Sequence, residues 1–486
     1  MCGIYAISNC HAAGNAVLDG LKKLEYRGYD SWGIAVRTGD SAVSITKGVG
    51  KISAVKSTLP DGAVAIGHTR WATHGGVSKK NAHPHRVGRV TLVHNGIVEN
   101  FDALKKKVSV QYRLKTQTDS EVAAALIDSF LTGNTKPEAA LEKAAREIEG
   151  RFAFVVLFDG DPRIYALRHG SPLILGRTKE SVYVASDIPA FLAYTRSVNY
   201  LNDGEMAVID EARVTFKDLN GGKTIKKRAT TVPWQDEEAE KGTWPHFMLK
   251  EIFEQRTTIA GAVKREANDI TAFVSELRTA KNVYLVASGT AHKVAMAGEY
   301  LFATIADYKV RAVLAEEMPS FERFVDKHTA LVAISQSGET ADVLEILEHG
   351  KKRGARIFSI VNVESSTMAR ISHQCLTLGA GPEKAVASTK AMTAQMALLM
   401  VCAHALRNGK SAMKKNVETG RRALLRAAKS ISDALTKNYA AHIGSVAHKI
   451  AGRNNLFILG RRALYPVALE AAIKIQEVSY IHAHGF

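Results

Sequence analysis

The chain has 486 residues, 46% hydrophobic and 23% charged, an ordinary composition for a globular protein of roughly two to four domains that excludes collagen-like, coiled-coil and wholly disordered chains. Lys and Arg exceed Asp and Glu by 17, but the basic residues lie in short, dispersed clusters without aromatic residues between them, so nucleic-acid binding is not expected. Residues 1–20 lack a basic segment leading into an apolar one, and no long apolar run follows, so we expect no secretory signal, no membrane span and a cytoplasmic location.

The first part of the chain is predicted to combine strands with helices. Short apolar runs predict strands at 64–68, 90–94, 152–158, 164–168, 182–186 and 206–210. Helical periodicity lies between them, at 18–24, 120–131 and 137–148. This pattern predicts helices packed on sheets, in an α+β or layered α/β domain over residues 2–217.

Turn residues and charges dominate residues 218–247, including the run Asp236–Glu240, so we expect a linker there. After the linker, strands alternate with helices. The expected strands are 283–287, 310–314, 330–334, 356–361 and 375–378, and a long buried helix is expected over 392–406. Such alternation predicts a doubly wound parallel sheet in a domain spanning residues 248–410.

The last part of the chain holds a basic helical connector, expected over 411–440, and the start of another α/β domain over 441–486. The latter contains one strand, at 456–460, and one helix, from Pro466 towards Ile481. One strand and one helix cannot cover their own apolar faces. Either this pair docks onto the preceding domain or the chain is incomplete at its C-terminal end, and of the two we expect the incomplete chain.

Four cysteines, Cys2, Cys10, Cys375 and Cys402, are too few and too scattered for a disulfide framework or a CxxC metal site. Cys2 stands out by its position, although a cysteine there is by itself usually incidental. Removal of Met1 would leave a thiol and a free α-amino group on one residue, with ordinary pKa values of about 8.5 and about 7.8. Such an amine can serve as the base of a nucleophile near neutral pH.

Five motifs surround this nucleophile candidate in sequence order. They are Cys2-Gly3-Ile4, Tyr26-Arg27-Gly28-Tyr29-Asp30-Ser31, the run His68–Gly75, the run His94–Asn100 and Thr118-Asp119-Ser120-Glu121. Together they resemble the class II glutamine amidotransferases, and more closely the family of glutamine:fructose-6-phosphate aminotransferases, also called glucosamine-6-phosphate synthases. The resemblance implies an N-terminal-nucleophile domain with α/β/β/α layers.

The same resemblance implies a role for each residue of the first site. Cys2 attacks the side-chain amide of glutamine and releases ammonia through a thioester. Arg70 and Asp119 bind the α-carboxylate and the α-ammonium of glutamine, to which their charges are opposite. The other implied roles are an oxyanion hole of the Asn95 side chain and the Gly96 N–H, a pocket lined by Thr73 and His74, and an ammonia gate at Trp71.

Five histidines lie between His68 and His94, and the run His83-Pro84-His85 raises the possibility of a metal site. No carboxylate or cysteine lies at ligand spacing from them, and histidines at strand ends are more often hydrogen-bonded structure. We therefore expect no metal.

Three strand-to-helix turns in the second half are rich in hydroxyl side chains. They are Ser288–Thr290, Ser335–Thr340 and Ala387–Lys390. Backbone N–H and hydroxyl groups at helix N-termini suit a phosphate at the carboxyl edge of a parallel sheet. One such turn could be only a helix cap, but three on one sheet favour ligand binding.

Two of these turns carry a further resemblance, to the SIS (sugar isomerase) domain of the same family, in Ser-Gln-Ser-Gly-Glu-Thr at 335–340 and Val-Ala-Ser-Thr-Lys at 386–390. The residues that the resemblance assigns to fructose 6-phosphate are Thr290, Ser335, Gln336, Ser337, Thr340 and Ser388. Ala291 stands where the family has a second hydroxyl, so one sugar contact is expected to be lost or replaced.

Near the C-terminal end, Glu470, Lys474 and Glu477 share one helix face by their spacing, which surface ion pairing would also explain. The segment resembles the opening of a second SIS domain, which implies that Glu477 moves a proton between C1 and C2 of the sugar and that Lys474 assists. The family's ring-opening histidine and imine-forming lysine find no match in the sequence. We therefore expect glutamine hydrolysis but little amino-sugar synthesis.

The resemblance covers residues 2–483. It implies that L-glutamine and D-fructose 6-phosphate give glutamate and glucosamine 6-phosphate without a cofactor, in an enzyme that is commonly a homodimer. Two alternatives stay open: a class II amidotransferase acting on another phosphosugar, and a non-enzymatic sugar-phosphate sensor built on SIS domains. A sensor would not need Arg70, Asn95, Gly96 and Asp119 alongside Cys2.

Overall fold

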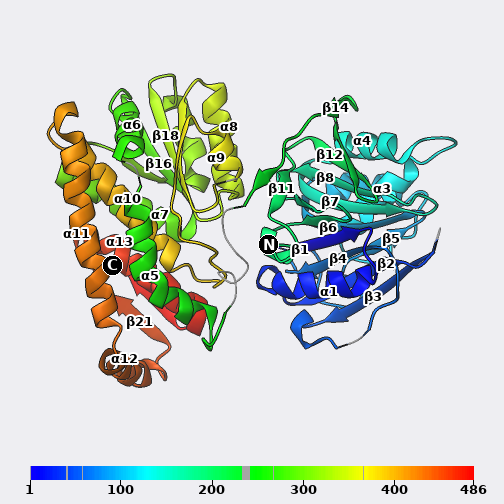
Figure 1. Ribbon diagram of the computed structural model, residues 1–486, viewed down its shortest axis with the longest axis horizontal. Coiled ribbons are helices and arrows are strands. Elements are labelled where there is room, and N and C mark those ends of the chain that lie inside the picture. The colour runs from blue at the N-terminus through cyan, green and yellow to red at the C-terminus, as the bar shows by residue number, and fades with distance from the viewer. Residues whose placement is uncertain (1, 40–41, 57, 233–240, 266, 365) are drawn as a thin grey trace. The chain divides into compact units, whose positions relative to one another are not determined.

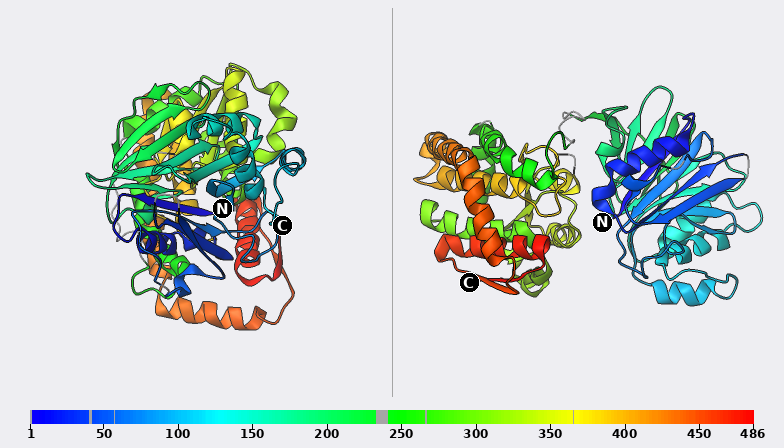
Figure 2. Two further views of the ribbon diagram at one scale, coloured as in Figure 1. Left: turned by 90° about the vertical axis from the view of Figure 1, so that its right-hand side faces the viewer. Right: turned by 90° about the horizontal axis from the view of Figure 1, so that it is seen from below.

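The computed structural model describes residues 2–39, 42–56, 58–232, 241–265, 267–364 and 366–486. The chain divides into two compact units, Met1–Glu237 and Glu238–Phe486, which are drawn in Figures 1 and 2. Met1 and residues 233–240 of the expected linker lie outside the described residues. Within the described ranges, no helix is long and apolar enough to cross a bilayer.

Two antiparallel sheets form the centre of the first unit, with the strand orders β15-β11-β9-β10-β1-β4-β2-β3 and β14-β13-β12-β8-β7-β6-β5. The strands of the first sheet are β1 (Gly3–Ser8), β2 (Ser31–Arg37), β3 (Val43–Val49), β4 (Val64–Arg70), β9 (Ile174–Arg177), β10 (Val182–Ala185), β11 (Ser197–Tyr200) and β15 (Thr230–Thr231). Those of the second sheet are β5 (His85–Val87), β6 (Val90–Val98), β7 (Gly150–Phe158), β8 (Ile164–His169), β12 (Glu205–Asp210), β13 (Arg213–Asp218) and β14 (Thr224–Ile225).

The helices of the first unit cover the outer faces of both sheets (Figures 1 and 2). They are α1 (Ala13–Lys23), α2 (Phe101–Val108), α3 (Asp119–Ser129) and α4 (Pro137–Glu147). The predicted helices at 120–131 and 137–148 are thus confirmed to within two residues. The helix predicted at 18–24 begins earlier, directly after Ala12, whose left-handed backbone turns the chain into α1.

Side chains of β1 alternate between two cores, as the pleat of a strand requires. Ile4 and Ala6 pack between the two sheets with Val93 of β6, whereas Tyr5 and Ile7 face the core beneath α1. A third core lies between the second sheet and the helices α2, α3 and α4. The layers are therefore helix, sheet, sheet and helix, which confirms the expected α/β/β/α fold.

A five-stranded parallel sheet organises the second unit, with the strand order β17-β16-β18-β19-β20. Its strands are β16 (Asn282–Ala287), β17 (Arg311–Leu314), β18 (Thr329–Ser335), β19 (Arg356–Val361) and β20 (Gln374–Thr377). The helices on the sheet are α5 (Phe247–Val263), α6 (Ala267–Leu277), α7 (Gly289–Ala306), α8 (Ala341–Lys352), α9 (Thr367–Ile371), α10 (Lys390–Leu406) and α11 (Met413–Ala434), with the 3-10 segment η5 (Ala315–Phe324).

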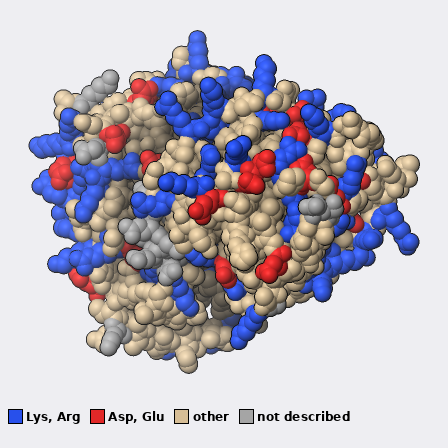
Figure 3. Space-filling model, turned by 45° about the vertical axis from the view of Figure 1, so that its right-hand side comes forward, with Lys and Arg blue, Asp and Glu red and all other residues tan. Residues whose placement is uncertain are grey.

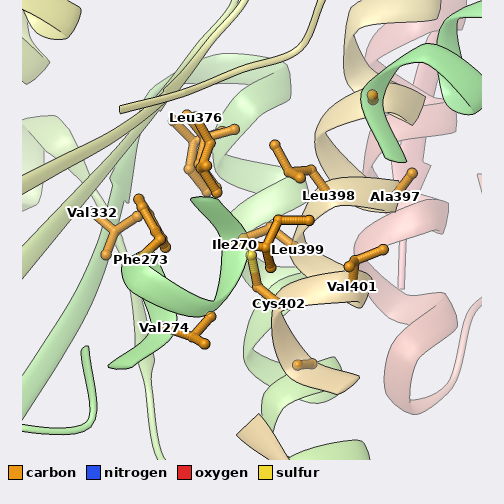
Figure 4. Close-up of a cluster of buried hydrophobic side chains, with 14 of the residues drawn as sticks. Ile270, Phe273, Val274, Val332, Leu376, Ala397, Leu398, Leu399, Val401 and Cys402 are labelled. Carbon is orange, nitrogen blue, oxygen red and sulfur yellow. The ribbon is translucent and has the colours of Figure 1, made fainter. Parts of the chain in front are cut away.

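Helices cover this sheet on both faces, which confirms the doubly wound prediction. One core joins the sheet to α5, α6, α7, α10 and α11, and Figure 4 shows Cys402 of α10 among its apolar side chains. The other core joins the sheet to η5, α8 and α9. Near-continuous apolar residues in α10 follow from its position in the middle of the larger core.

The C-terminal residues form a small layer of their own. They comprise α12 (Lys437–Ile450), β21 (Asn455–Ile458), α13 (Tyr465–Ser479) and β22 (His482–Gly485), and β21 pairs with β22 in parallel. The helix α13 packs against α7, so the last helix docks onto the preceding α/β unit. Two features were not predicted: the helix α12, which begins at the end of the expected connector and lies mostly in the segment expected over 441–486, and the strand β22.

Lys and Arg side chains are spread over the face drawn in Figure 3, with Asp and Glu among them. This distribution agrees with the dispersed basic clusters read from the sequence. The excess of 17 positive charges is thus shared among many separate positions.

Candidate functional site

Three segments that are distant in sequence converge on Cys2 at the start of β1. The Trp71 N–H points at the Cys2 Sγ atom, with 3.4 Å between nitrogen and sulfur. The Cys2 carbonyl accepts hydrogen bonds from Arg27 Nε and Asn95 Nδ2, each at 3.2 Å. Burial raises the pKa of the Cys2 thiol, and the Trp71 backbone and the Arg70 charge oppose that rise. A thiol in this setting needs a base before it can act as a nucleophile.

Arg27 lies beside Cys2, a placement that the sequence did not predict. Its side chain is buried, and Nη1 lies 3.2 Å from Asp187 Oδ2, which also accepts a 2.6 Å hydrogen bond from the Tyr26 hydroxyl. The Tyr26–Ser31 motif marked the segment, but Asp187 lies 160 residues away. No spacing rule could therefore connect Arg27 with Asp187 or with Cys2.

Arg70, at the end of β4, shapes the loop that follows it. Its guanidinium donates to the carbonyls of His74 at 2.6 Å, Gly75 at 3.0 Å and Gly76 at 3.1 Å. A planar group with five N–H donors can organise three carbonyls and still present a donor elsewhere. The side chain of Thr73 in this loop is exposed, and the His74 ring packs on Phe101 with the ring centres 4.6 Å apart.

Asn95 and Gly96 lie side by side on β6. Gly96 has φ +144°, and a Cβ atom there would lie 1.9 Å from the Arg151 carbonyl oxygen. Only glycine fits this position, because other residues rarely adopt this backbone and no space exists for a side chain. The strand is thereby held against β7 while Asn95 reaches the backbone of Cys2.

Asp119 begins α3, and its carboxylate is almost completely buried. Oδ2 accepts a 2.9 Å hydrogen bond from the Val98 N–H, and Thr118 caps the helix by accepting from the Glu121 N–H. Four of the five clustered histidines, His68, His83, His85 and His94, are also buried near this helix start and bond to one another, to Ser120 or to Thr118. Hydrogen bonding thus accounts for the His-Pro-His run.

In the second unit, the hydroxyl-rich turns lie at the carboxyl ends of the parallel strands. The strand β17 lies on one side of β16, and the later strands β18, β19 and β20 lie on its other side. Open α/β sheets bind ligands at such a switch point, between β16 and β18. Thr290 follows β16, and Ser335 ends β18. Ser335 Oγ lies 3.0 Å from Thr340 Oγ1 and accepts from the Gly338 N–H at 3.0 Å, while Ser337 Oγ accepts from the Glu339 N–H at 3.1 Å. Gln336 is half-buried in this turn.

The other two turns are already bonded to carboxylates of this chain. Ser388 Oγ donates to Glu383 Oε2 at 2.8 Å, and Glu383 Oε1 accepts from the backbone N–H groups of Thr389 and Ala391 at the start of α10. Thr290 Oγ1 donates to Glu470 Oε1 at 2.9 Å. A negative charge therefore occupies the N-terminus of α10, where an anion would otherwise be favoured.

The predicted helix face of Glu470, Lys474 and Glu477 is present on α13. Lys474 Nζ lies 3.3 Å from Glu470 Oε1 and 2.7 Å from Glu477 Oε2. Glu470 is buried, and burial raises the pKa of its carboxyl against the opposing charge of Lys474. The three side chains therefore differ from an ordinary exposed ion pair, because Glu470 also accepts a hydrogen bond from Thr290 of α7.

Family models agree with both units. A glutamine amidotransferase domain matches residues 68–193, and a SIS domain matches residues 276–405. Fold and side-chain arrangement together define a class II glutamine amidotransferase domain joined in one chain to a SIS domain.

Relatives match this chain over its whole length, and two of them serve as examples. The glutamine–fructose-6-phosphate aminotransferase [isomerizing] of Thermus thermophilus is 39% identical, and that of Thermococcus kodakarensis is 38% identical; each alignment spans 100% of this chain and 82% of the relative. This chain belongs to the glutamine–fructose-6-phosphate aminotransferase family. Among solved structures, the C-terminal domain of glucosamine-fructose-6-phosphate aminotransferase from Francisella tularensis is 28% identical with a TM-score of 0.45, over 51% of this chain and 71% of that chain.

Proposed function

We propose that this chain transfers the amide nitrogen of L-glutamine to D-fructose 6-phosphate, forming glucosamine 6-phosphate and glutamate, the first step of amino-sugar synthesis. The observation that carries the proposal is the convergence of Trp71, Arg27 and Asn95 on Cys2, in a chain that aligns over its whole length with aminotransferases of this name.

In the first half-reaction, the Cys2 thiolate attacks the amide carbon of glutamine. The α-amino group left after removal of Met1 accepts the thiol proton and returns it to the departing nitrogen, so that the C–N bond breaks and ammonia leaves. Asn95 Nδ2 and the Gly96 N–H stabilise the negative oxygen of the intermediate. Water then hydrolyses the thioester to glutamate.

Glutamine is selected by two opposite charges. Arg70 takes its α-carboxylate and Asp119 its α-ammonium, while Thr73, His74 and Trp71 line the pocket. The burial of Arg70 and Asp119 supports these roles, since charge-assisted hydrogen bonds strengthen where water is excluded.

In the second unit, the sugar phosphate binds at the Ser335–Thr340 turn, through Ser335, Gln336, Ser337 and Thr340. Support comes from the two neighbouring turns, which face carboxylates of this chain and would repel a phosphate. Ser388 then contacts the sugar, and so does Thr290, which the family resemblance places near the phosphate but whose hydroxyl faces Glu470.

The proton transfer between C1 and C2 of the sugar falls to Glu477, assisted by Lys474. The 2.7 Å contact between Lys474 Nζ and Glu477 Oε2 supports this pairing, because it brings the proposed base and the assisting ammonium together on one face of α13.

The same proposal extends to the domain boundaries, the oligomeric state and the cellular location of the enzyme. Residues 2–217 form the glutaminase domain, 218–247 the linker, 248–410 the first SIS domain, 411–440 a helical connector and 441–486 the start of a second SIS domain. The protein forms a homodimer in the cytoplasm, and its four free cysteines agree with a reducing compartment.

Glutamine labelled with ¹⁵N at the amide tests the function directly. The protein is incubated with labelled glutamine and fructose 6-phosphate, and glutamate and ¹⁵N-glucosamine 6-phosphate are measured by mass spectrometry. Labelled amino sugar would support the full reaction, whereas glutamate release with little labelled amino sugar is the result expected from the lack of a match for the family's ring-opening histidine and imine-forming lysine. Transfer to a different hexose phosphate would favour another amidotransferase, and sugar-phosphate binding without glutamine turnover would favour a sensor.

A further inference from the structure

Behind the proposed glutamine site, three imidazoles and one hydroxyl form a continuous buried hydrogen-bond network, and a fourth imidazole, that of His85, packs edge-on against His83. His68 lies on β4, His85 on β5 and His94 on β6, with His83 just before β5, and Ser120 is the second residue of α3. Each of the five residues is at most 5% exposed. None of them has a role in the chemistry proposed above.

Ser120 is the junction of this network. Its Oγ lies 2.9 Å from His83 Nε2 and 2.9 Å from His94 Nδ1, and it donates to Asp119 Oδ1 at 3.3 Å. Because a hydroxyl has one proton, donation to Asp119 requires both imidazoles to donate to Ser120. The hydroxyl is thus oriented by two donors towards the carboxylate.

The imidazole protons can be assigned from the partners. Burial lowers the pKa of His68 to about 3 and holds the pKa of His83 well below its usual range, so each ring carries a single N–H near neutral pH. His68 Nε2 lies 2.8 Å from the His94 carbonyl, which only accepts, and therefore carries its proton there. His83 Nδ1, 3.0 Å from the same His68 nitrogen, must then be the unprotonated one, and His83 Nε2 holds the proton that points at Ser120.

The network touches both sides of the proposed site. At one end, Ser120 contacts the carboxylate of Asp119. At the other, His68 bonds to the His94 carbonyl, which belongs to the peptide group that joins His94 to Asn95. Along β6, neighbouring side chains point to opposite faces, so His94 faces the network while Asn95 reaches Cys2.

We propose that Ser120, oriented by His83 and His94, is a positioning residue that aims the Asp119 carboxylate at the α-ammonium of glutamine. The proposal rests on the glutaminase function proposed above. Ser120 touches neither the reacting amide nor Cys2, so its effect is on glutamine binding and not on the chemical step.

The first test compares Ser120→Ala with Ser120→Thr. Loss of the hydroxyl is expected to raise KM for glutamine about tenfold, with kcat within about twofold, because a carboxylate without its partner is poorly oriented. Threonine keeps a hydroxyl and should restore the wild-type KM. Ser129→Ala is the matched control, since Ser129 on the same helix donates to the Leu126 carbonyl, away from this network.

The second test uses His83, in case Ser120→Ala folds poorly. Glutamine can place an amide donor near the position of Nε2, whereas asparagine cannot reach Ser120. His83→Asn should raise KM for glutamine and His83→Gln should not. Thermal unfolding of each variant separates a loss of stability from a change in binding.

The possible outcomes distinguish the two proposals. If the wild-type protein releases no glutamate, the proposed function fails and the positioning role falls with it. If the wild type releases glutamate and both Ser120→Ala and His83→Asn keep the wild-type KM, only the positioning role is overturned. A fall in kcat without a change in KM would also overturn it.

Discussion

The two units bury titratable groups of opposite kinds. Around the proposed glutamine site of the first unit, the buried groups whose pKa values burial shifts include imidazoles, and because burial lowers these values the rings stay neutral and act as directional hydrogen-bonding groups. In the second unit they are carboxylates, such as Glu251 and Glu470, whose pKa values burial raises. Burial thus favours the neutral form of these groups in both units but shifts their pKa values in opposite directions, so the two units should differ in their response to pH.

The largest effect is expected where the first site depends on backbone geometry. Gly96→Ala would place a Cβ atom 1.9 Å from the Arg151 carbonyl oxygen at φ +144°. We expect a loss of about 3 kcal/mol in the free energy of unfolding of the first unit and the loss of glutaminase activity. Calorimetry and glutamate release measure the two effects.

Gly221→Ala provides the matched control in the same unit, because a Cβ atom on Gly221 meets nothing within 4 Å. It should change neither quantity. Wild-type glutamate release by Gly96→Ala would contradict the assigned role of this strand position.

The next effect concerns Glu251 of α5, which accepts hydrogen bonds from the Lys384 and Ala385 N–H groups. Burial raises the pKa of Glu251 to about 7, from an ordinary 4.5. The folded protein therefore holds this proton more tightly than the unfolded chain, and stability falls as the pH rises from about 4.5 to about 7, by about 3 kcal/mol in all. Glu251→Gln keeps an acceptor without the charge and should remove that fall.

Unfolding of the second unit at pH 5 and pH 8 provides the measurement. Glu345→Gln, at an exposed carboxyl of α8, is the control and should leave the wild-type pH dependence in place. An unchanged pH dependence in Glu251→Gln would refute the assignment.

The first unit should respond to acid in the opposite sense. Burial lowers the pKa of His68 to about 3 from 6.5, so the unfolded chain binds protons that the folded unit excludes. The contribution of neutral His68 to the free energy of unfolding is complete above pH 6.5 and is lost as the pH falls towards 3. At pH 5 the loss from His68 alone is about 2 kcal/mol. His68→Gln retains a donor for the His94 carbonyl and should lose less stability between pH 7.5 and pH 5 than the wild type does.

The smallest expected effect is the loss of a helix cap, and it should be equal for one cap in each unit. Thr118 caps α3 and Ser366 caps α9, each accepting from the backbone N–H three residues on. Thr118→Ala and Ser366→Ala should each lower the free energy of unfolding by about 1 kcal/mol. A clear difference between the two caps would show that their other contacts outweigh the helix ends.

The sequence predicted the elements with strong periodicity and the motifs that flank them. The helix predicted at 392–406 is α10 (Lys390–Leu406), and the strand predicted at 356–361 is β19. A long apolar stretch must be buried wherever it packs, so such elements can be located from the sequence without knowing their tertiary contacts. The strand β22 escaped prediction because His482–Gly485 has no apolar pattern and pairs with β21 only after α13 has crossed between them.

Contacts between side chains that are far apart in the chain could not be predicted from the sequence. The contact of Arg27 with Asp187 spans 160 residues, and that of Thr290 with Glu470 spans 180. The run His83-Pro84-His85 raised the possibility of a metal site, which the spacing disfavoured, but sequence does not show which hydrogen-bond partners the rings meet. Only the fold brings Ser120 beside His83 and Thr118 beside His85.

One measurement tests the central claim that Cys2 is the nucleophile: glutamate release by Cys2→Ala beside Cys10→Ala, a second partly exposed cysteine of the same unit. Intact-mass spectrometry of both variants confirms that Met1 is processed as in the wild type. The account predicts that Cys2→Ala falls to background while Cys10→Ala keeps the wild-type rate. Undiminished glutamate release by Cys2→Ala would contradict it.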